Sequence, residues 1–223
     1  MPRRIDHRAV RSGSIFIALS LCCAAAVAER VAVGSFSSQG LDDWRHHSFS
    51  GSTHYRLVDA GSGDVVRAQS KGAASALYRE VYVDLRRTPW LHWRWKVDRN
   101  GTIPNVDERI RSGDDYAARI YVVTRTGPLP WQTRAVNYVW SNNQPAGQRW
   151  PSAFTDSSLM IAVRSGNAQT GEWLEERRNV REDFARFLGN GIDSIELIAL
   201  MSDSDQTGTS VAAEYGDIFF SSN

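Results

Sequence analysis

The stretch LHWRWKV, residues 91–97, decides the fold class because its apolar and polar side chains alternate without a break. Successive side chains of a β-strand point to opposite faces of a sheet, whereas a helical face repeats about every 3.6 residues. The tryptophans Trp93 and Trp95 therefore share one face, which we expect to lie in the core. The stretch thus predicts a half-buried strand, whose polar face consists of His92, Arg94 and Lys96.

Short runs of β-branched and aromatic residues recur along the rest of the chain and are separated by turn residues. This pattern is typical of an all-β sandwich or barrel. The runs that we expect to be strands are 54–58, 65–69, 77–85, 90–98, 116–124, 135–141, 158–164, 172–178, 194–201 and 212–220.

One helix is expected over residues 180–188. Asn179 and Glu182 form a capping pair before it, and Gly189 ends it. Its apolar stripe suits a helix that covers an open end of the sandwich; the stripe consists of Val180, Phe184, Phe187 and Leu188.

If every strand from residue 90 onward crosses the sandwich once, successive connections lie at opposite ends. The segments 126–134, 165–171 and 202–211 would then share one end. The other end would hold the segments 99–115 and 142–156 and the helix.

The first 28 residues have the composition of a secretory signal peptide. Four arginines precede an apolar run, 15–28, that ends in Ala26-Val27-Ala28. That run is shorter than the roughly 20 residues that span a bilayer. It also contains both cysteines, Cys22 and Cys23, so the mature chain would have none.

We therefore expect export to the periplasm of a Gram-negative bacterium, with one domain over 29–223 and no stable membrane insertion after cleavage. An acylated lipoprotein is the competing interpretation, but Leu21 precedes Cys22 where a small residue is usual.

The charge of the mature chain argues against nucleic acid as a partner. The leader contains four of the 26 basic residues and one of the 25 acidic residues, which leaves 22 basic and 24 acidic residues and a formal charge of −2. Proteins that bind nucleic acid usually present a basic face to the phosphates.

Five segments stand out for their combination of motifs: WRWKVD (93–98), DERIRSGDDYAARIYVV (107–123), NYVWSN (137–142), the run 161–184 and DSDQTGTSVAAEYGDIFF (203–220). Together they resemble the bacterial family known as domain of unknown function 3047. The resemblance implies a jelly-roll-like antiparallel β-sandwich, similar to galactose-binding and other carbohydrate-binding modules. The activity of that family is not established, so no functional residue is carried over.

The segment 203–214 has the spacing of an EF-hand calcium loop. Oxygen-bearing side chains stand at places 1, 3 and 5, which are Asp203, Asp205 and Thr207, and Gly208 and Glu214 take places 6 and 12. Its flanks read as strands instead of helices. The alternative is a tight turn in which the three side chains bond backbone amides and Gly208 adopts a positive φ.

Two further groups of residues are candidates for a saccharide site. Trp131 and Trp150 stand in expected loops, where indole rings could stack on sugar rings, although loop tryptophans also tuck into the core rim. If the middle strands are neighbours, their polar faces would form a groove for an acidic glycan; if they are not, these faces are simply solvated. The residues of this candidate groove are His92, Arg94, Lys96, Arg119, Tyr121, Asn137 and Ser141.

Conventional catalysis finds little support, because the sequence has no G-x-S-x-G, P-loop or G-x-G-x-x-G motif and no histidines at metal-ligand spacing. Adjacent carboxylates such as Asp114-Asp115 would point to opposite faces of a strand. The expected function is a non-enzymatic module that binds a saccharide or cell-envelope glycan. The alternatives are a structural or protein-interaction module and a polysaccharide lyase or hydrolase, with Tyr121 or His92 as the base of a lyase.

Overall fold

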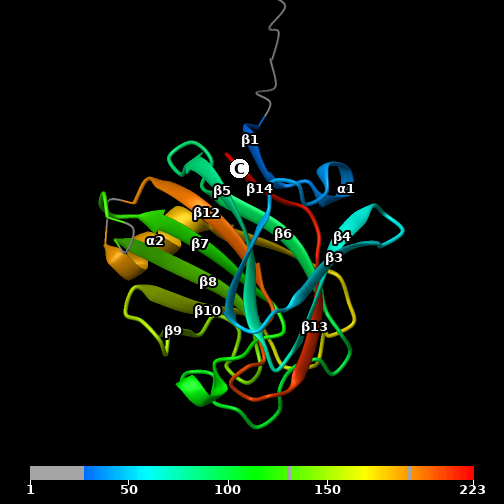
Figure 1. The fold of residues 1–223 in the computed structure, drawn as a ribbon. Coiled ribbons are helices and arrows are strands. Elements are labelled where there is room, and N and C mark those ends of the chain that lie inside the picture. The colour runs from blue at the N-terminus through cyan, green and yellow to red at the C-terminus, as the bar shows by residue number, and fades with distance from the viewer. Residues whose placement is uncertain (1–27, 130–131, 190–191) are drawn as a thin grey trace, which may run out of the picture.

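The computed structural model describes residues 28–129, 132–189 and 192–223, which form two β-sheets packed face to face (Figure 1). Residues 1–27 of the expected signal peptide, and Trp131, lie outside the described residues. The strands are β1 (Arg30–Gly34), β2 (Arg45–Ser50), β3 (His54–Asp59), β4 (Asp64–Lys71), β5 (Ala74–Asp84), β6 (Trp90–Val97), β7 (Arg119–Arg125), β8 (Thr133–Ser141), β9 (Arg149–Pro151), β10 (Ser158–Ser165), β11 (Leu174–Asn179), β12 (Ser194–Met201), β13 (Ser210–Tyr215) and β14 (Ile218–Ser221). The helices are α1 (Phe36–Gln39), the 3₁₀ turn η1 (Arg111–Gly113) and α2 (Val180–Leu188).

The first sheet, here called the β6 sheet, has the strand order β1-β14-β6-β13-β4-β3. One side of β6 pairs with β11 along its length, and the other side is shared by β13 and β14. The run 212–220, which was expected as one strand, is two strands. Gly216 and Asp217 interrupt the strand between β13 and β14.

The second sheet, here called the β7 sheet, has the order β2-β5-β12-β7-β8-β10-β9. Its pairs are antiparallel except that β10 runs parallel to β8. The short strand β9, which the sequence did not predict, returns the chain and pairs antiparallel with β10. The expected sandwich is confirmed, with this one mixed pairing.

The alternation in residues 90–97 is confirmed: every second side chain of β6 is buried. Trp93 and Trp95 pack inward against the β7 sheet, where Trp93 stacks on Tyr138 at 5.3 Å and Trp95 lies 5.9 Å from Trp140. The indole Nε1 of Trp95 donates to Glu176 at 3.0 Å. Large aromatic rings from both sheets therefore fill the space between them.

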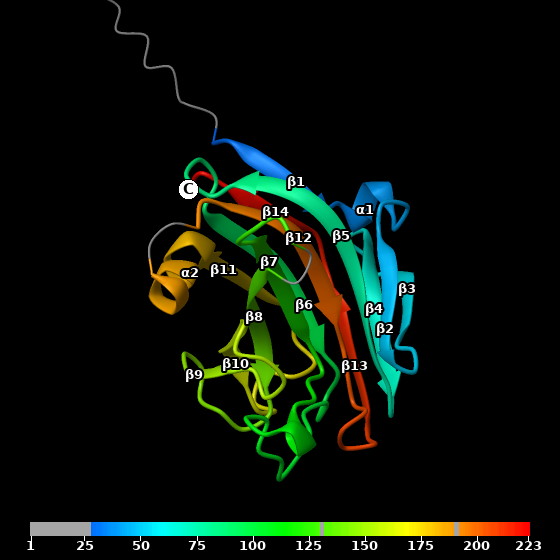
Figure 2. The same ribbon diagram turned by 60° about the vertical axis from the view of Figure 1, so that its left-hand side comes forward.

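The expected helix is confirmed over Val180–Leu188. The side chain of Asn179 accepts from the amide of Glu182 at 3.2 Å, and Gly189 ends the helix with a φ of 82°. Val180 and Phe184 are fully buried in the core between the sheets, and α2 lies where β11 ends (Figure 2). No helix of the described residues is long and apolar enough to cross a membrane.

The expected distribution of the loops between the two ends is wrong. Thr102 bonds Asn167, and the amide of Thr207 bonds Asp115, so the segments after β6, β10 and β12 gather at one end (Figure 1, bottom). The reason is the parallel pair: β9 adds a crossing, so the later connections change ends.

Candidate functional site

The polar residues of the middle strands lie on opposite sides of the molecule. The strand β6 belongs to one sheet, and β7 and β8 belong to the other. A single groove from all three strands is therefore wrong, because alternation shows which residues share a face and not which strands are neighbours. The outer face of the β6 sheet, the β6 face, carries His92, Arg94 and Lys96; the outer face of the β7 sheet, the β7 face, carries Arg119, Tyr121, Asn137 and Ser141.

On the β6 face, His92 is held by its neighbours. Its Nε2 lies 2.9 Å from the Ser221 hydroxyl, and its ring stacks on Phe219 with the ring centroids 4.6 Å apart. Burial, together with the positive charge of Arg177, lowers the pKa of His92 below its usual 6.5. The neutral ring is thus favoured in the folded protein.

The remaining cations of the β6 face are mostly paired. Lys96 lies 2.5 Å from Glu214, which also pairs with Arg67 at 3.2 Å. The guanidinium of Arg94 lies over the ring of Trp173 at 4.9 Å. This face has the features of a solvated, ion-paired surface.

A wide, polar hollow of about 430 Å³ lies at the loop end of this face. Arg67 occupies one side of it and makes two hydrogen bonds to Asp98, at 2.5 and 2.6 Å. Two of the charged residues that line this hollow, Arg67 and Asp98, therefore already bind one another.

On the β7 face, four of the candidate residues lie together. Tyr121 stands opposite Asn137 on the neighbouring strand, and the row continues to both edges of the sheet. In order, it consists of Trp150, Met160, Asn137, Tyr121, Ala199, Tyr78 and Arg45. Arg119 lies two positions from Tyr121 along β7 and so faces the same way.

Trp150 is part of a strand and not of a loop, which corrects the expectation. It lies on β9 and is 5% exposed. It belongs to a small second core on the β7 face, with Tyr116, Val139, Met160 and Ala162. Buried in this way, the indole is not available to stack on a sugar.

Arg119 is the centre of a buried polar cluster. Its Nη1 donates to the Tyr121 hydroxyl at 2.6 Å, and its Nη2 donates to Asp203 at 2.9 Å and lies 3.8 Å from Asp114. Burial raises the pKa values of Asp203, Asp114 and Tyr121, although the positive charge of Arg119 opposes each shift. Tyr121 therefore stays protonated and is a weak candidate for a base.

The EF-hand spacing does not produce the ligand set that it predicted. Glu214 lies on the β6 face with Lys96, while Asp203 and Asp205 lie close to Asp115, which comes from the loop before β7. The turn interpretation is correct about Gly208, which has a φ of 67°. The amide of Thr207 is bound by Asp115, at 2.7 Å, and not by a side chain of the turn.

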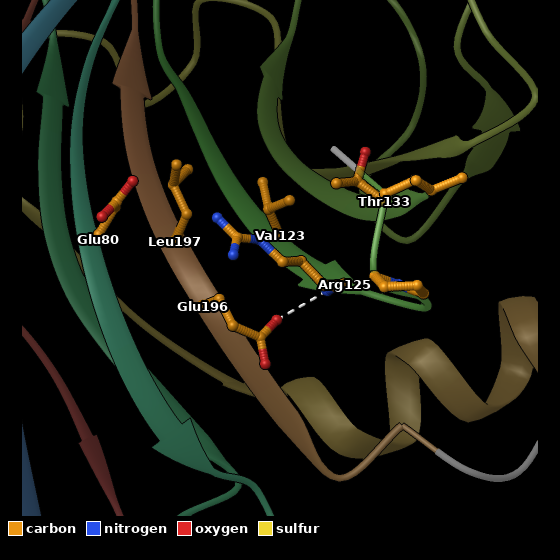
Figure 3. Close-up of a pocket in the computed structure, with 8 residues that line it drawn as sticks. Glu80, Val123, Arg125, Thr133, Glu196 and Leu197 are labelled. Atoms are coloured by element: carbon orange, nitrogen blue, oxygen red, sulfur yellow. Dashed lines mark hydrogen bonds between the residues drawn. The ribbon is translucent and has the colours of Figure 1, made fainter. Parts of the chain in front are cut away.

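The β7 face also contains a hollow of about 300 Å³, at the end away from Arg119. Val123 and Leu197, which are partners across β7 and β12, form its apolar floor (Figure 3). Its other lining residues are Glu80, Arg125, Pro128, Leu129, Thr133 and Glu196.

Polar groups enter this hollow from three strands. The carboxylate of Glu196 accepts from the backbone amide of Arg125 at 2.7 Å, and the Arg125 side chain reaches into the hollow (Figure 3). Glu80, on β5, pairs in register with Leu197. Two positions farther along their strands, Tyr78 and Tyr121 extend the same face beyond the hollow.

The sequence analysis missed these lining residues, although one of them carried a signal. On β5, Tyr78, Glu80 and Tyr82 stand at every second position and so share one face, as the polar residues of β6 do. Glu196 and Leu197 are adjacent in sequence and would point to opposite faces of a regular strand. A register shift between Ile195 and Leu197 breaks the alternation, and both residues line the hollow.

Comparison with known proteins agrees with the fold. The profile of the family described as protein of unknown function (DUF3047) matches residues 42–219. The chain belongs to this family. Among curated proteins, none matches the chain.

Solved structures include a carbohydrate-binding module with the same architecture as this DUF3047 protein. A family 30 module of a Clostridium thermocellum cellulosomal cellulase superposes with a TM-score of 0.50 at 12% identity, covering 81% of this chain and 92% of that one. A family 11 module from the same organism, in complex with a mixed-linked tetrasaccharide, has a TM-score of 0.45 at 12% identity, with coverages of 88% and 96%.

The xyloglucanase domain of NopAA from Sinorhizobium fredii has a TM-score of 0.41 at 7% identity, with coverages of 81% and 94%. Of the three, the first establishes the shared jelly-roll sandwich. At this identity the likeness concerns the fold alone, because one fold supports many functions.

Proposed function

We propose that the protein binds a saccharide in the hollow on the β7 face. The observation that carries this proposal is the combination of an apolar floor, Val123 and Leu197, with carboxylate and guanidinium groups at its rim. Sugars offer apolar C–H faces and many hydroxyls, so they need such a mixture. The fold that is shared with a family 30 carbohydrate-binding module supports the same class of ligand.

The charges of the hollow favour a neutral saccharide. Glu80 and Glu196 contribute two negative charges and Arg125 one positive charge. Carboxylates accept hydrogen bonds from sugar hydroxyls, whereas the carboxylate or sulfate of an acidic glycan would be repelled. This replaces the acidic glycan that the cations of the β6 face had suggested.

The size of the hollow favours a short stretch of a longer chain. Its volume of about 300 Å³ is at the lower end of the roughly 300–1,000 Å³ usual for ligand pockets. A bound oligosaccharide would continue along the face over Tyr78, whose half-buried ring offers a stacking surface.

A glycan array with purified protein, followed by calorimetric titration of the best ligand, tests the proposal. Leu197→Arg places a long charged side chain on the floor and should abolish measurable binding. Arg94→Ala, on the β6 face, is the control and should leave the affinity unchanged. If Arg94→Ala abolishes binding and Leu197→Arg does not, the site lies on the β6 face. The absence of any ligand would favour a structural or protein-interaction module.

Trp131 remains a candidate from the sequence alone. It follows Leu129, which lines the hollow, by two residues. If its indole stacks on the sugar, Trp131→Ala should weaken binding by several-fold, since stacking contributes about 0.5–1.5 kcal/mol.

A glycoside hydrolase is the second function that the hollow favours, because two carboxylates, Glu80 and Glu196, line it. A carboxylate pair is the usual machinery of glycosidic bond cleavage. Release of reducing ends from the ligand, lost in both Glu80→Gln and Glu196→Gln, would identify an enzyme. Tight binding without hydrolysis would identify a binding module.

We also propose that the protein is exported to the periplasm after cleavage behind Ala28. Strand β1 begins at Arg30, so this cleavage leaves the β6 sheet intact. Mass spectrometry of the protein from its native envelope should find Glu29 at the N-terminus. An acylated Cys22 or Cys23 there would show a lipoprotein instead.

A further inference from the structure

Two loops at one end of the sandwich bring three carboxylates together. Asp115 lies in the segment between η1 and β7, and Asp203 and Asp205 lie between β12 and β13. One oxygen from each carboxylate lies within 4.8 Å of those of the other two. Asp115 and Asp203 are buried, and Asp205 is partly exposed, so the cluster can be reached from solvent.

Each member of the cluster accepts at least one hydrogen bond. Asp115 accepts from the amides of Gln206 and Thr207, at 3.2 and 2.7 Å. One oxygen of Asp203 accepts from Arg119, and Asp205 accepts from the side chain of Gln206 at 2.8 Å. These contacts hold the three carboxylates in place and leave lone pairs free.

Independently, one carboxylate oxygen of the cluster and one beside it are buried and lack a hydrogen-bond partner. In the part of the chain that the structure describes, Oδ1 of Asp203 and Oδ1 of Asp114 have no hydrogen bond. Asp203 is only 2% exposed. A buried carboxylate oxygen without a partner is costly, and its negative charge calls for a cation or a hydrogen-bond donor.

The charges of this region point to a cation. Four carboxylates, those of Asp114, Asp115, Asp203 and Asp205, surround one guanidinium, that of Arg119. A divalent ion would bring this arrangement close to neutrality and would give the free oxygen of Asp203 a ligand role.

We propose that the protein binds one calcium ion between these loops, through Asp115, Asp203 and Asp205. Calcium takes oxygen ligands in irregular geometries, whereas magnesium requires a near-octahedral arrangement and keeps more of its water. This ligand set differs from the EF-hand spacing, because Asp115 replaces Thr207 and Glu214. The proposal is independent of saccharide binding.

The ion would clamp the loop before β7 to the loop after β12. Arg119 begins β7 and contacts both Asp203 and Tyr121. Calcium would therefore stabilise the loop end of the β7 sheet more than the distant hollow.

Calorimetric titration of the chelator-treated protein with calcium chloride tests the site. We expect one ion per chain and a melting temperature several degrees higher in calcium than in chelator. Asp115→Asn and Asp205→Asn should each weaken calcium affinity by at least about tenfold. Asp203 is unsuitable for substitution because it also pairs with Arg119.

Two control variants test whether calcium binding depends on the proposed ligands and not on other acidic residues. Glu214→Gln tests the EF-hand spacing, and Asp107→Asn removes another acidic residue of the loop before β7, one that pairs with Arg109. Both should bind calcium as the unaltered protein does. Coincident melting curves in chelator and calcium would overturn the proposal. So would loss of binding in Glu214→Gln with retention in Asp115→Asn.

Discussion

The two outer faces of the sandwich are both rich in charge, but they use it differently. On the β6 face, Lys96, Glu214 and Arg67 form ion pairs that remain partly open to solvent. On the β7 face, Arg119 and its carboxylate partners are almost fully buried, and the open area is a hollow with an apolar floor. Burial therefore separates a solvated surface from one that can hold a ligand.

The largest expected effect is on stability, in a comparison of one arginine from each face. Arg119→Met should destabilise the protein by about 3–5 kcal/mol, because it leaves buried carboxylates without their cation. Arg67→Met, on the β6 face, should cost about 1 kcal/mol or less, because its partners remain near water. Urea unfolding in the presence of chelator measures both, and equal losses would remove the distinction between the faces.

The second effect concerns binding and uses one aromatic residue from each face. Tyr78→Ala should weaken saccharide binding by about 1 kcal/mol, or roughly fivefold, through the loss of a stacking surface. Trp173→Ala, beside Arg94 on the β6 face, should not change the affinity. Titration of both variants with the same oligosaccharide compares them, and a larger loss in Trp173→Ala would move the site to the β6 face.

The third effect is the salt dependence of stability, which should differ between the two faces. Glu214→Gln removes one partner from both Lys96 and Arg67 and should cost about 1 kcal/mol or less at low salt. At 1 M salt the Debye length falls to about 3 Å, so the cost should shrink. The cost of Arg119→Met should persist, because buried charges are screened much less. A salt-independent cost for Glu214→Gln would contradict this.

The smallest effect is the pH dependence that His92 gives to the β6 face. Its folded pKa is lowered, first by burial and then by Arg177 and Arg30, against a weaker opposing bond from Asn223. The stability from neutral His92 is therefore fully present above the unfolded pKa of about 6.5 and is lost as the pH falls from there through the lowered folded pKa.

Melting temperatures at pH 5 and pH 8 test this, with His92→Gln as the comparison. The unaltered protein should lose more stability at pH 5 than His92→Gln does, because all other groups titrate in both. An equal loss would show that His92 keeps an ordinary pKa.

Much of the local structure could be predicted from the sequence. The alternation in 91–97 predicted a buried face with Trp93 and Trp95, and the pair Asn179 and Glu182 predicted where α2 begins. Both depend on side chains within a few residues of one another, which strand parity and helix capping describe directly.

The candidate site was harder to predict. Arg119, Tyr121 and Asn137 do share one face of the β7 sheet, but the sequence also placed the polar residues of β6 in the same groove. In addition, Arg119 is buried and Trp150 packs into a second core. The hollow was missed because the register shift at Ile195 turns Glu196 and Leu197 to the same side. A prediction from strict alternation along a strand cannot locate such a shift.

By itself, then, the sequence determined the sandwich class, most of the strands with their buried faces, the helix and the family. The tertiary structure decided that β6 and β7 belong to different sheets, that β10 runs parallel to β8, and that Asp115 meets Asp203. The physical reason is distance along the chain. Side-chain parity is a local property of the backbone, whereas strand neighbours and buried charge pairs join residues that are far apart in sequence, such as Arg30 and Ser221, and depend on how the whole core packs.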